Sequence, residues 1–140
     1  MKKAYLELAR LAEKARFSAH APYSKFRVGA ALLTKSGDVI TGCNIETSSY
    51  GLTICAERTA IFKALSEGSK AFSAIAVASD DSEFTPPCGA CRQVLFELAG
   101  DIDFIMVNQK HQLKVIKLSR LLPFAFTDTN LQRTEGQRKK

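Results

Sequence analysis

The sequence contains no apolar run long enough to cross a membrane, because a spanning helix needs at least about 18 consecutive apolar residues. Its first ten residues, MKKAYLELAR, lack the continuous apolar centre of a signal peptide. Cysteine is scarce, with 4 in 140 residues, and a chain of this length can bury enough apolar surface to fold without disulfides. We therefore expect a cytosolic protein with reduced thiols.

Internal repeats, linkers and low-complexity segments are also absent from the sequence. Hydrophobic residues make up 46% of the chain and charged residues 24%, which is typical of a globular protein rather than a disordered one. A single domain is the simplest organisation for this length. We expect that domain over residues 1–128, followed by a basic, flexible tail over residues 129–140.

The net charge of +6 is not concentrated in a basic run with interleaved aromatic residues. Such a run would favour nucleic-acid binding. Part of the charge lies in the last residues, Arg138, Lys139 and Lys140. We interpret the charge as a solvated surface with a basic tail and do not expect a nucleic-acid partner.

Hydrophobic periodicity predicts alternating helices and strands along the chain. Helices are expected over 3–18, 54–66 and 88–99, and strands over 26–33, 38–43, 71–79, 103–108 and 113–118. The strand over 71–79 is apolar throughout, which is typical of a strand covered on both faces. This order predicts an α/β fold with one mixed five-stranded sheet and helices on its faces.

A carboxylate lies on the apolar face of the predicted helix over 54–66. The inward face of this helix carries Ala60, Ile61 and Ala64, and helical steps of three and four residues place Glu57 on the same face. A charged group directed at a core needs a partner or a function.

Three of the four cysteines lie at the starts of predicted helices. Cys55 begins one helix, and Cys88 and Cys91 share one face at the start of another, directly after Pro87. The positive end of a helix favours thiolates, which are good zinc ligands. Three protein ligands leave the fourth tetrahedral position to water, whose pKa zinc lowers to about 7. Glu57 could accept the proton of that water.

Other roles for these cysteines fit the sequence less well. A CxxC pair alone is compatible with a redox motif or half of a zinc finger. No second CxxC is present, and a redox motif explains neither Cys55 nor Glu57. Cys43 could complete a four-cysteine site, although a small buried residue at a strand end is the favoured interpretation. His20 and His111 have no metal-ligand spacing and are expected in loops or at the surface.

Arg58 follows Glu57 on the same helix. Zinc with three thiolates carries net negative charge, and a guanidinium that donates hydrogen bonds to the sulfurs would offset it. The alternative is a solvent-facing arginine, since most arginines lie at the surface.

CAE followed by PCGAC resembles the zinc-dependent nucleoside and nucleotide deaminases. With cysteine as the first ligand, the chain resembles the small homotetrameric cytidine deaminases. The resemblance extends through APYSKFRVGAAL, GCNIE, SYGLTICAERTA, PCGACRQVL and LLPFAF, and so covers residues 21–126. It implies a three-layer α/β/α sandwich, a catalytic domain over 1–128 and one Zn²⁺ per chain. Cys55, Cys88 and Cys91 would be the ligands, and Glu57 would be the proton shuttle.

The resemblance also implies residues that bind the substrate. Asn44 and Glu46 would hold the ribose hydroxyls, and their spacing of two in an extended segment points both side chains the same way. Phe26 would pack against the pyrimidine, and the backbone N–H of Ala56, unpaired at a helix start, would contact the base carbonyl. Phe126 would reach the site of a neighbouring subunit. Tyr50 belongs to the matching loop pattern without an assigned role.

The implied reaction is hydrolytic deamination of cytidine and deoxycytidine to uridine and deoxyuridine with release of ammonia, as in pyrimidine salvage. Within the enzyme class, the alternatives are a polynucleotide-editing cytosine deaminase and a blasticidin-type deaminase. Cys55 and the NIE segment argue against them. A zinc-binding regulatory module is the non-enzymatic alternative, and it would have no need of Glu57.

Overall fold

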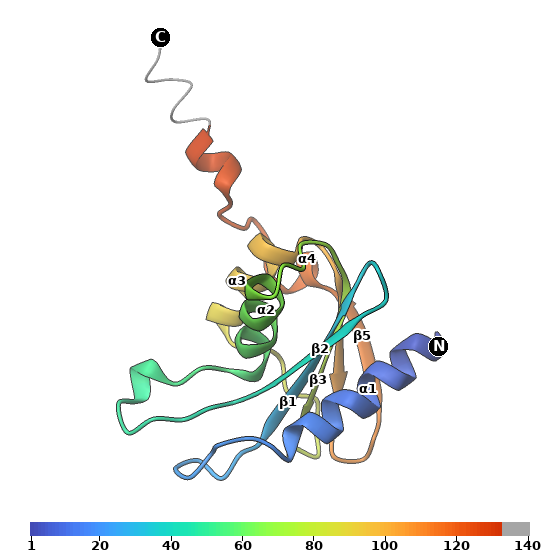
Figure 1. Cartoon of the computed structure of the whole chain (residues 1–140), viewed down its shortest axis with the longest axis vertical. Coiled ribbons are helices and arrows are strands. Elements are labelled where there is room, and N and C mark those ends of the chain that lie inside the picture. The colour runs from blue at the N-terminus through green and yellow to red at the C-terminus, as the bar shows by residue number, and fades with distance from the viewer. Residues whose placement is uncertain (133–140) are drawn as a thin grey trace.

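Five strands form one mixed sheet in the computed structural model, which describes residues 1–132 (Figure 1). The strand order is β2-β1-β3-β4-β5. β3 and β4 are parallel, and the other neighbouring pairs are antiparallel. The strands are β1 Val28–Thr34, β2 Val39–Cys43, β3 Phe72–Ser79, β4 Asp103–Val107 and β5 Leu113–Lys117.

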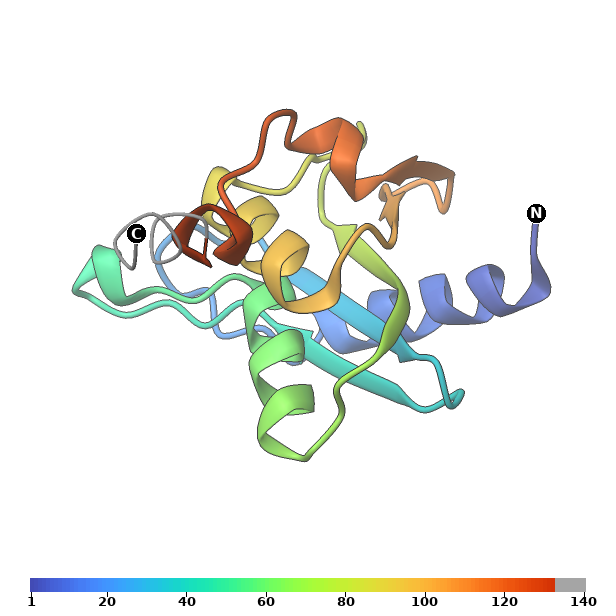
Figure 2. The ribbon, with the colours of Figure 1, turned by 90° about the horizontal axis from the view of Figure 1, so that it is seen from above.

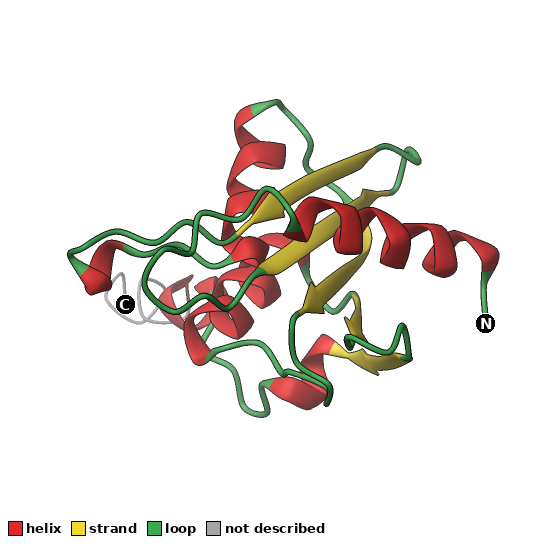
Figure 3. Cartoon of the chain, turned by 90° about the horizontal axis from the view of Figure 1, so that it is seen from below, coloured by secondary structure: helices red, strands yellow, loops and turns green. Residues whose placement is uncertain are grey.

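Helices cover both faces of this sheet. α1 (Lys3–Arg16) crosses one face, and α2 (Ala56–Ser66) and α3 (Gly89–Ala99) lie on the other with the short α4 (Leu118–Leu121) (Figures 1 and 3). The predicted three-layer α/β/α sandwich with a five-stranded mixed sheet is confirmed. None of the helices in residues 1–132 combines the length and apolar character that membrane crossing requires.

The two cores differ in the size of their strand residues. Beneath α1 the sheet presents mainly alanines, namely Ala31, Ala74, Ala76 and Ala78. Beneath α2 and α3 it presents larger side chains, among them Leu32, Ile40, Ile75, Val77, Phe104 and Met106. A single helix can therefore approach one face closely, whereas two helices and a wider apolar layer cover the other.

Each of the helices α1 and α2 lies directly on a glycine of the sheet. A Cβ at Gly29 in β1 would lie 2.2 Å from the Ala12 carbonyl oxygen of α1. A Cβ at Gly42 in β2 would lie 2.6 Å from the Ala60 nitrogen and 2.8 Å from the Ala56 oxygen of α2. Both contacts are with backbone, so each glycine sets how near its helix lies to the sheet.

Two predicted element starts shift because long-range pairing replaces the local pattern. The strand expected from residue 26 begins at Val28, because the Asn44 amide hydrogen-bonds the backbone of Phe26 and Val28 where the ladder ends. The helix expected from residue 54 begins at Ala56, because Ile54 exchanges two backbone hydrogen bonds with Ile45.

The connection from β2 to α2 contains a 3₁₀ turn, η1 (Tyr50–Leu52), and extends outward from the sheet (Figure 2). The predicted stop of α2 is confirmed: Gly68 has φ +97° and closes the helix by donating to the Leu65 oxygen. After α4, residues 128–132 are helical, so the first part of the predicted flexible tail has regular structure. The rest of that predicted tail, 133–140, lies outside the described residues.

Candidate active site

Three cysteine sulfurs converge where α2 and α3 begin. Cys55 is the N-cap residue of α2, Cys88 is the N-cap of α3, and Cys91 lies in the first turn of α3. The Cys55 and Cys88 sulfurs are 3.7 Å apart, the Cys88 and Cys91 sulfurs are 3.4 Å apart, and all three lie within 4.8 Å of one another. A tetrahedral zinc ion with bonds of about 2.3 Å would separate its sulfur ligands by about 3.8 Å. The sulfur set therefore fits zinc.

The electrostatic surroundings favour negative charge on these sulfurs. Two helix N-termini meet at the cluster, so both helix dipoles present their positive ends to it. In the metal-free protein, a hydrogen bond from Cys91 is the main cause that lowers the pKa of the Cys55 thiol to about 5, and Arg58 adds to it. The same hydrogen bond, with burial, raises the pKa of Cys91. A cluster that already holds one thiolate loses fewer protons when a cation binds.

Glu57 is buried beside the sulfurs, with 4% of its surface exposed, as the helical pattern predicts. Burial is the main cause that raises the pKa of its carboxyl group, and the nearby Cys55 charge acts in the same direction. A carboxyl group with a raised pKa can both accept and return a proton near neutral pH.

Arg58 directs its guanidinium at the cluster, so it is not a solvent-facing residue. Its Nη2 donates a hydrogen bond to the Cys55 sulfur at 3.5 Å. Its buried Nε has no hydrogen-bond partner among residues 1–132. Hydrogen bonds to Cys55 are also the main cause that raises the pKa of the guanidinium, which stays positive and offsets thiolate charge.

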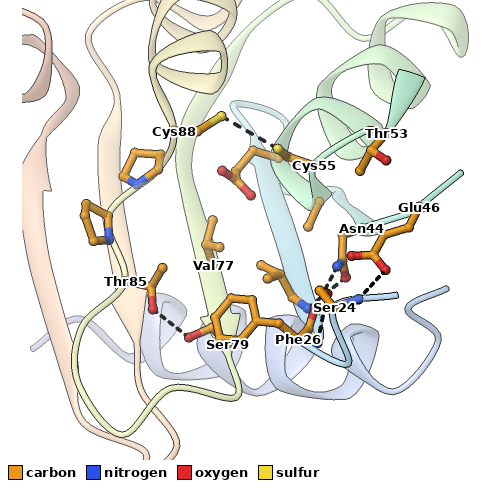
Figure 4. A pocket seen from close by; sticks show the side chains of 15 residues that line it. Ser24, Phe26, Asn44, Glu46, Thr53, Cys55, Val77, Ser79, Thr85 and Cys88 are labelled. Atoms are coloured by element: carbon orange, nitrogen blue, oxygen red, sulfur yellow. Dashed lines mark hydrogen bonds between the residues drawn. The ribbon is translucent and has the colours of Figure 1, made fainter. Parts of the chain in front are cut away.

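A cavity of about 330 Å³ opens next to the sulfurs (Figure 4). It brings together residues from β1, β2, α2 and the loops before α2 and α3. Five of the residues predicted from sequence to be outside the zinc cluster line it: Phe26, Asn44, Glu46, Ala56 and Glu57. In Figure 4 the sulfurs of Cys55 and Cys88 lie at one end, with Asn44 and Glu46 together on one side.

Asn44 and Glu46 each organise the cavity wall from which they project. Asn44 Nδ2 donates to the Phe26 oxygen at 2.8 Å, and its Oδ1 accepts from the Val28 nitrogen at 2.9 Å. Glu46 accepts from the backbone N–H groups of Tyr23 and Ser24, both at 3.1 Å. Hydrogen bonds, first of all from the Ser24 side chain, lower the pKa of Glu46, so it is anionic. Both groups retain donor or acceptor sites for a ligand, since an amide and a carboxylate each have more than two.

Residues 2–107 match the model of the cytidine and deoxycytidylate deaminase zinc-binding region. This chain belongs to that family. The zinc-binding region contains the cluster of Cys55, Cys88 and Cys91, so the predicted zinc cofactor is confirmed.

Similar proteins support the same assignment. A cytidine deaminase of Halalkalibacterium halodurans is 54% identical over 121 residues, which cover 86% of this chain and 92% of the relative. The crystal structure of cytidine deaminase from Burkholderia pseudomallei superposes with a TM-score of 0.85 at 46% identity, covering 90% of this chain and all of that one. A more distant relative is a blasticidin-S deaminase of Bacillus cereus, 33% identical over 74% of this chain and 79% of its own length.

Two residues implied by the family resemblance lie outside the cavity of the single chain. Tyr50 is 71% exposed and packs edge-on against Tyr23, at 5.7 Å between ring centres. Phe126 is 59% exposed, and its backbone oxygen accepts a hydrogen bond from Gln93. Their predicted roles depend on a neighbouring subunit and stay predictions.

The remaining candidate ligands do not join the cluster. Among residues 1–132, the group of cysteine, histidine and acidic side chains with metal-binding spacing consists of Cys55, Cys88 and Cys91. Cys43 is half-buried at the end of β2, and burial raises the pKa of its thiol. His111 is exposed and pairs with Glu13.

Sequence patterns did not reveal one wall of the cavity. Val77 and Ser79 of β3, with Thr85, Pro86 and Pro87 of the following loop, line the side next to Cys88. The loop DDSEFTPP has no helix or strand periodicity, and its hydroxyl groups carry no signal until the fold places them. Only the proline pair before Cys88 hinted at a rigid segment there.

Proposed function

We propose that this chain is a zinc-dependent hydrolase that deaminates cytidine and deoxycytidine to uridine and deoxyuridine, using one zinc ion per chain. The observation that carries this proposal is the three-sulfur cluster beside the buried Glu57, at one end of a cavity that also holds Asn44 and Glu46. The family and its cytidine deaminase members support the same reaction.

Glu57 is the proposed proton shuttle. A zinc ion held by Cys55, Cys88 and Cys91 would supply an activated water as the nucleophile. Glu57 takes a proton from the attacking water, delivers it to ring nitrogen N3, and then assists departure of the amino group as ammonia. Its raised pKa supports both directions of transfer.

The cavity walls supply orientation. The Ala56 backbone N–H lies in the first turn of α2, where helical N–H groups lack helical partners, and it is directed to the base carbonyl O2. Phe26 offers an apolar ring to the pyrimidine. Asn44 and Glu46 hold the sugar hydroxyls, and both ribose and deoxyribose present a 3′ hydroxyl to them.

We also propose a homotetramer in which neighbouring subunits complete the cavities. Large apolar side chains are exposed on the outward loop and on the segment after α4, including Tyr50, Leu52, Phe124 and Phe126. Burying such surface against another copy would be favourable. Light scattering of the purified chain tests the assembly, and a monomer with full activity would exclude a role for Phe126 in a neighbouring site.

One assay series tests the reaction. Cytidine and deoxycytidine should be deaminated, and ammonia should appear in step with uridine or deoxyuridine. Blasticidin S belongs in the series because of the Bacillus cereus relative, and a cytosine-containing oligonucleotide tests polynucleotide editing. Turnover of blasticidin S or the oligonucleotide without turnover of cytidine would overturn the proposal.

A further inference from the structure

The loop from β3 to α3 forms the cavity wall that faces away from Asn44 and Glu46. In Figure 4, Thr85 lies on the opposite side of the cavity from these two residues. Val77, Thr85, Pro86 and Pro87 line this side. None of the steps described above uses this wall. We propose that it determines specificity at carbon C5 of the base, excluding cytosines with a C5 substituent. This inference rests on the proposed function.

The orientation of the base follows from three contacts. The amino-bearing carbon C4 must lie at the sulfurs and Glu57, and the sugar nitrogen N1 must point to Asn44 and Glu46. The carbonyl O2 lies toward the Ala56 N–H on the α2 side. In a six-membered ring these positions leave one free edge, C5–C6, on the side opposite O2. That edge faces the β3–α3 loop.

A closed ring of hydrogen bonds holds this wall. The Thr85 hydroxyl donates to Asp81 Oδ2 at 3.1 Å, and the Ser79 hydroxyl, 3.0 Å from the Thr85 oxygen, donates to it in turn. The Asp81 backbone N–H closes the ring on Ser79 Oγ at 3.3 Å. Each of the two hydroxyl groups therefore both donates and accepts. Hydroxyl groups fully paired in this way restrict motion of the loop.

The ring is anchored to the sheet. Ser79 is the last residue of β3 and only 3% exposed, and its oxygen accepts a hydrogen bond from Arg16 Nη1 at 3.1 Å. The Asp81 oxygen accepts from the Gln109 nitrogen, just after β4, at 2.8 Å. Thr85 then leads directly into Pro86 and Pro87, whose rings restrict the backbone. A methyl group at C5 would therefore meet a wall that does not yield.

Thr85→Val tests the inference because it keeps the shape of the side chain and removes the hydroxyl from the ring. The measurement is kcat/KM for cytidine divided by kcat/KM for 5-methylcytidine. We expect the parent protein to favour cytidine by at least about tenfold, the low end of what one methyl-sized group decides in a rigid pocket. In Thr85→Val the wall can retreat, and the ratio should fall at least about fivefold.

Two variants serve as matched controls. Thr85→Ser keeps the hydroxyl and should retain the parent ratio. Thr34→Val removes a buried hydroxyl that accepts from the Asp38 nitrogen at the β1–β2 turn, away from the cavity, and should also retain the ratio. Zinc content should be equal in all four proteins, so that displacement of Cys88 is excluded as the cause. Asp81→Asn, which weakens the same ring, replaces Thr85→Val if that variant is unstable.

The outcomes separate the wall from the reaction. A parent protein that deaminates neither nucleoside refutes the proposed function. A parent that deaminates cytidine and 5-methylcytidine equally well refutes the wall alone. So does an unchanged ratio in Thr85→Val, or an equal fall in the ratio of Thr34→Val.

Discussion

The two faces of the sheet use the same packing device for different purposes. α1 lies on Gly29 and α2 lies on Gly42, in neighbouring strands, and each contact is between backbone atoms. Gly29 brings α1 onto an alanine-rich face and buries Leu8, Ala9 and Ala12. Gly42 fixes the first turn of α2, in which Ala56 and Glu57 lie next to Cys55. One contact builds a core and the other also places chemistry.

Polar groups differ between the faces in the same way. On the α1 side, buried and half-buried charges have partners: Arg16 pairs with Asp80 at 3.2 Å, and Tyr5 donates to Asp103. On the α2 side, Glu57 is buried without an ion pair among the described residues. Burial of an ionisable group without a partner destabilises a fold, so its presence indicates function.

Removing a zinc ligand should separate the faces most strongly. Cys88→Ala should lose bound zinc and all measurable deamination, because two protein ligands hold zinc far more weakly than three. Cys43→Ala is the matched control, since Cys43 is outside the cluster, and it should keep both. Metal analysis after dialysis, together with the cytidine assay, measures both quantities. Zinc retained in Cys88→Ala would contradict the ligand assignment.

Glu57→Gln should leave the metal and remove the proton shuttle. We expect kcat for cytidine to fall by about 10⁴-fold, the upper range for a general acid–base group, while zinc content is unchanged. The free energy of unfolding should not decrease, because a neutral amide replaces a buried acid. Glu67→Gln, at the exposed end of the same helix, is the control and should be fully active. A fall in kcat of less than tenfold in Glu57→Gln would show that another group transfers the proton.

The two glycines provide the most direct comparison of the faces. Gly42→Ala and Gly29→Ala should each reduce stability by about 1–3 kcal/mol, because backbone must move to admit a methyl group. Only Gly42→Ala should also lower kcat, by about 10²-fold, since it displaces Glu57 relative to the α3 ligands. The absorption spectrum of the cobalt-substituted protein should change in Gly42→Ala alone. Equal losses of kcat in both variants would mean that neither glycine positions the site.

The smallest effect is expected on the α1 side, at Tyr5→Phe. The hydrogen bond from Tyr5 is the main cause that lowers the pKa of Asp103, and Lys117 acts in the same direction. A lowered folded-state pKa stabilises the protein above the unfolded pKa of about 3.9 and loses that effect as the pH falls through the folded value. Tyr5→Phe should therefore cost about 1 kcal/mol at pH 7 and less below about pH 4.

Urea unfolding of Tyr5→Phe and the parent at several pH values measures this difference. The kcat of the folded variant should be unchanged, because Tyr5 lies across the sheet from the cavity. A difference in stability that does not narrow in acid would mean that the hydroxyl group acts by packing and not through Asp103.

Local patterns in the sequence were sufficient for the chemistry within each element. Helical spacing placed Glu57 on the buried face of α2 and put Cys88 and Cys91 on one face of α3. These inferences succeed because the period of a helix is fixed by backbone geometry and does not depend on distant residues. The same holds for the stop of α2 at Gly68, whose positive φ suits glycine.

Contacts between distant segments were decided only by the tertiary structure. It brings Cys55 within 3.7 Å of Cys88 across 33 residues, uses Gly42 to set the height of α2, and turns the loop at Thr85 into a cavity wall. It also leaves Tyr50 and Phe126 outside the cavity of the single chain. The sequence by itself determined which groups could perform the chemistry, because residue type and local period encode that. Their distances depend on how helices and strands pack, and packing is a property of the whole fold.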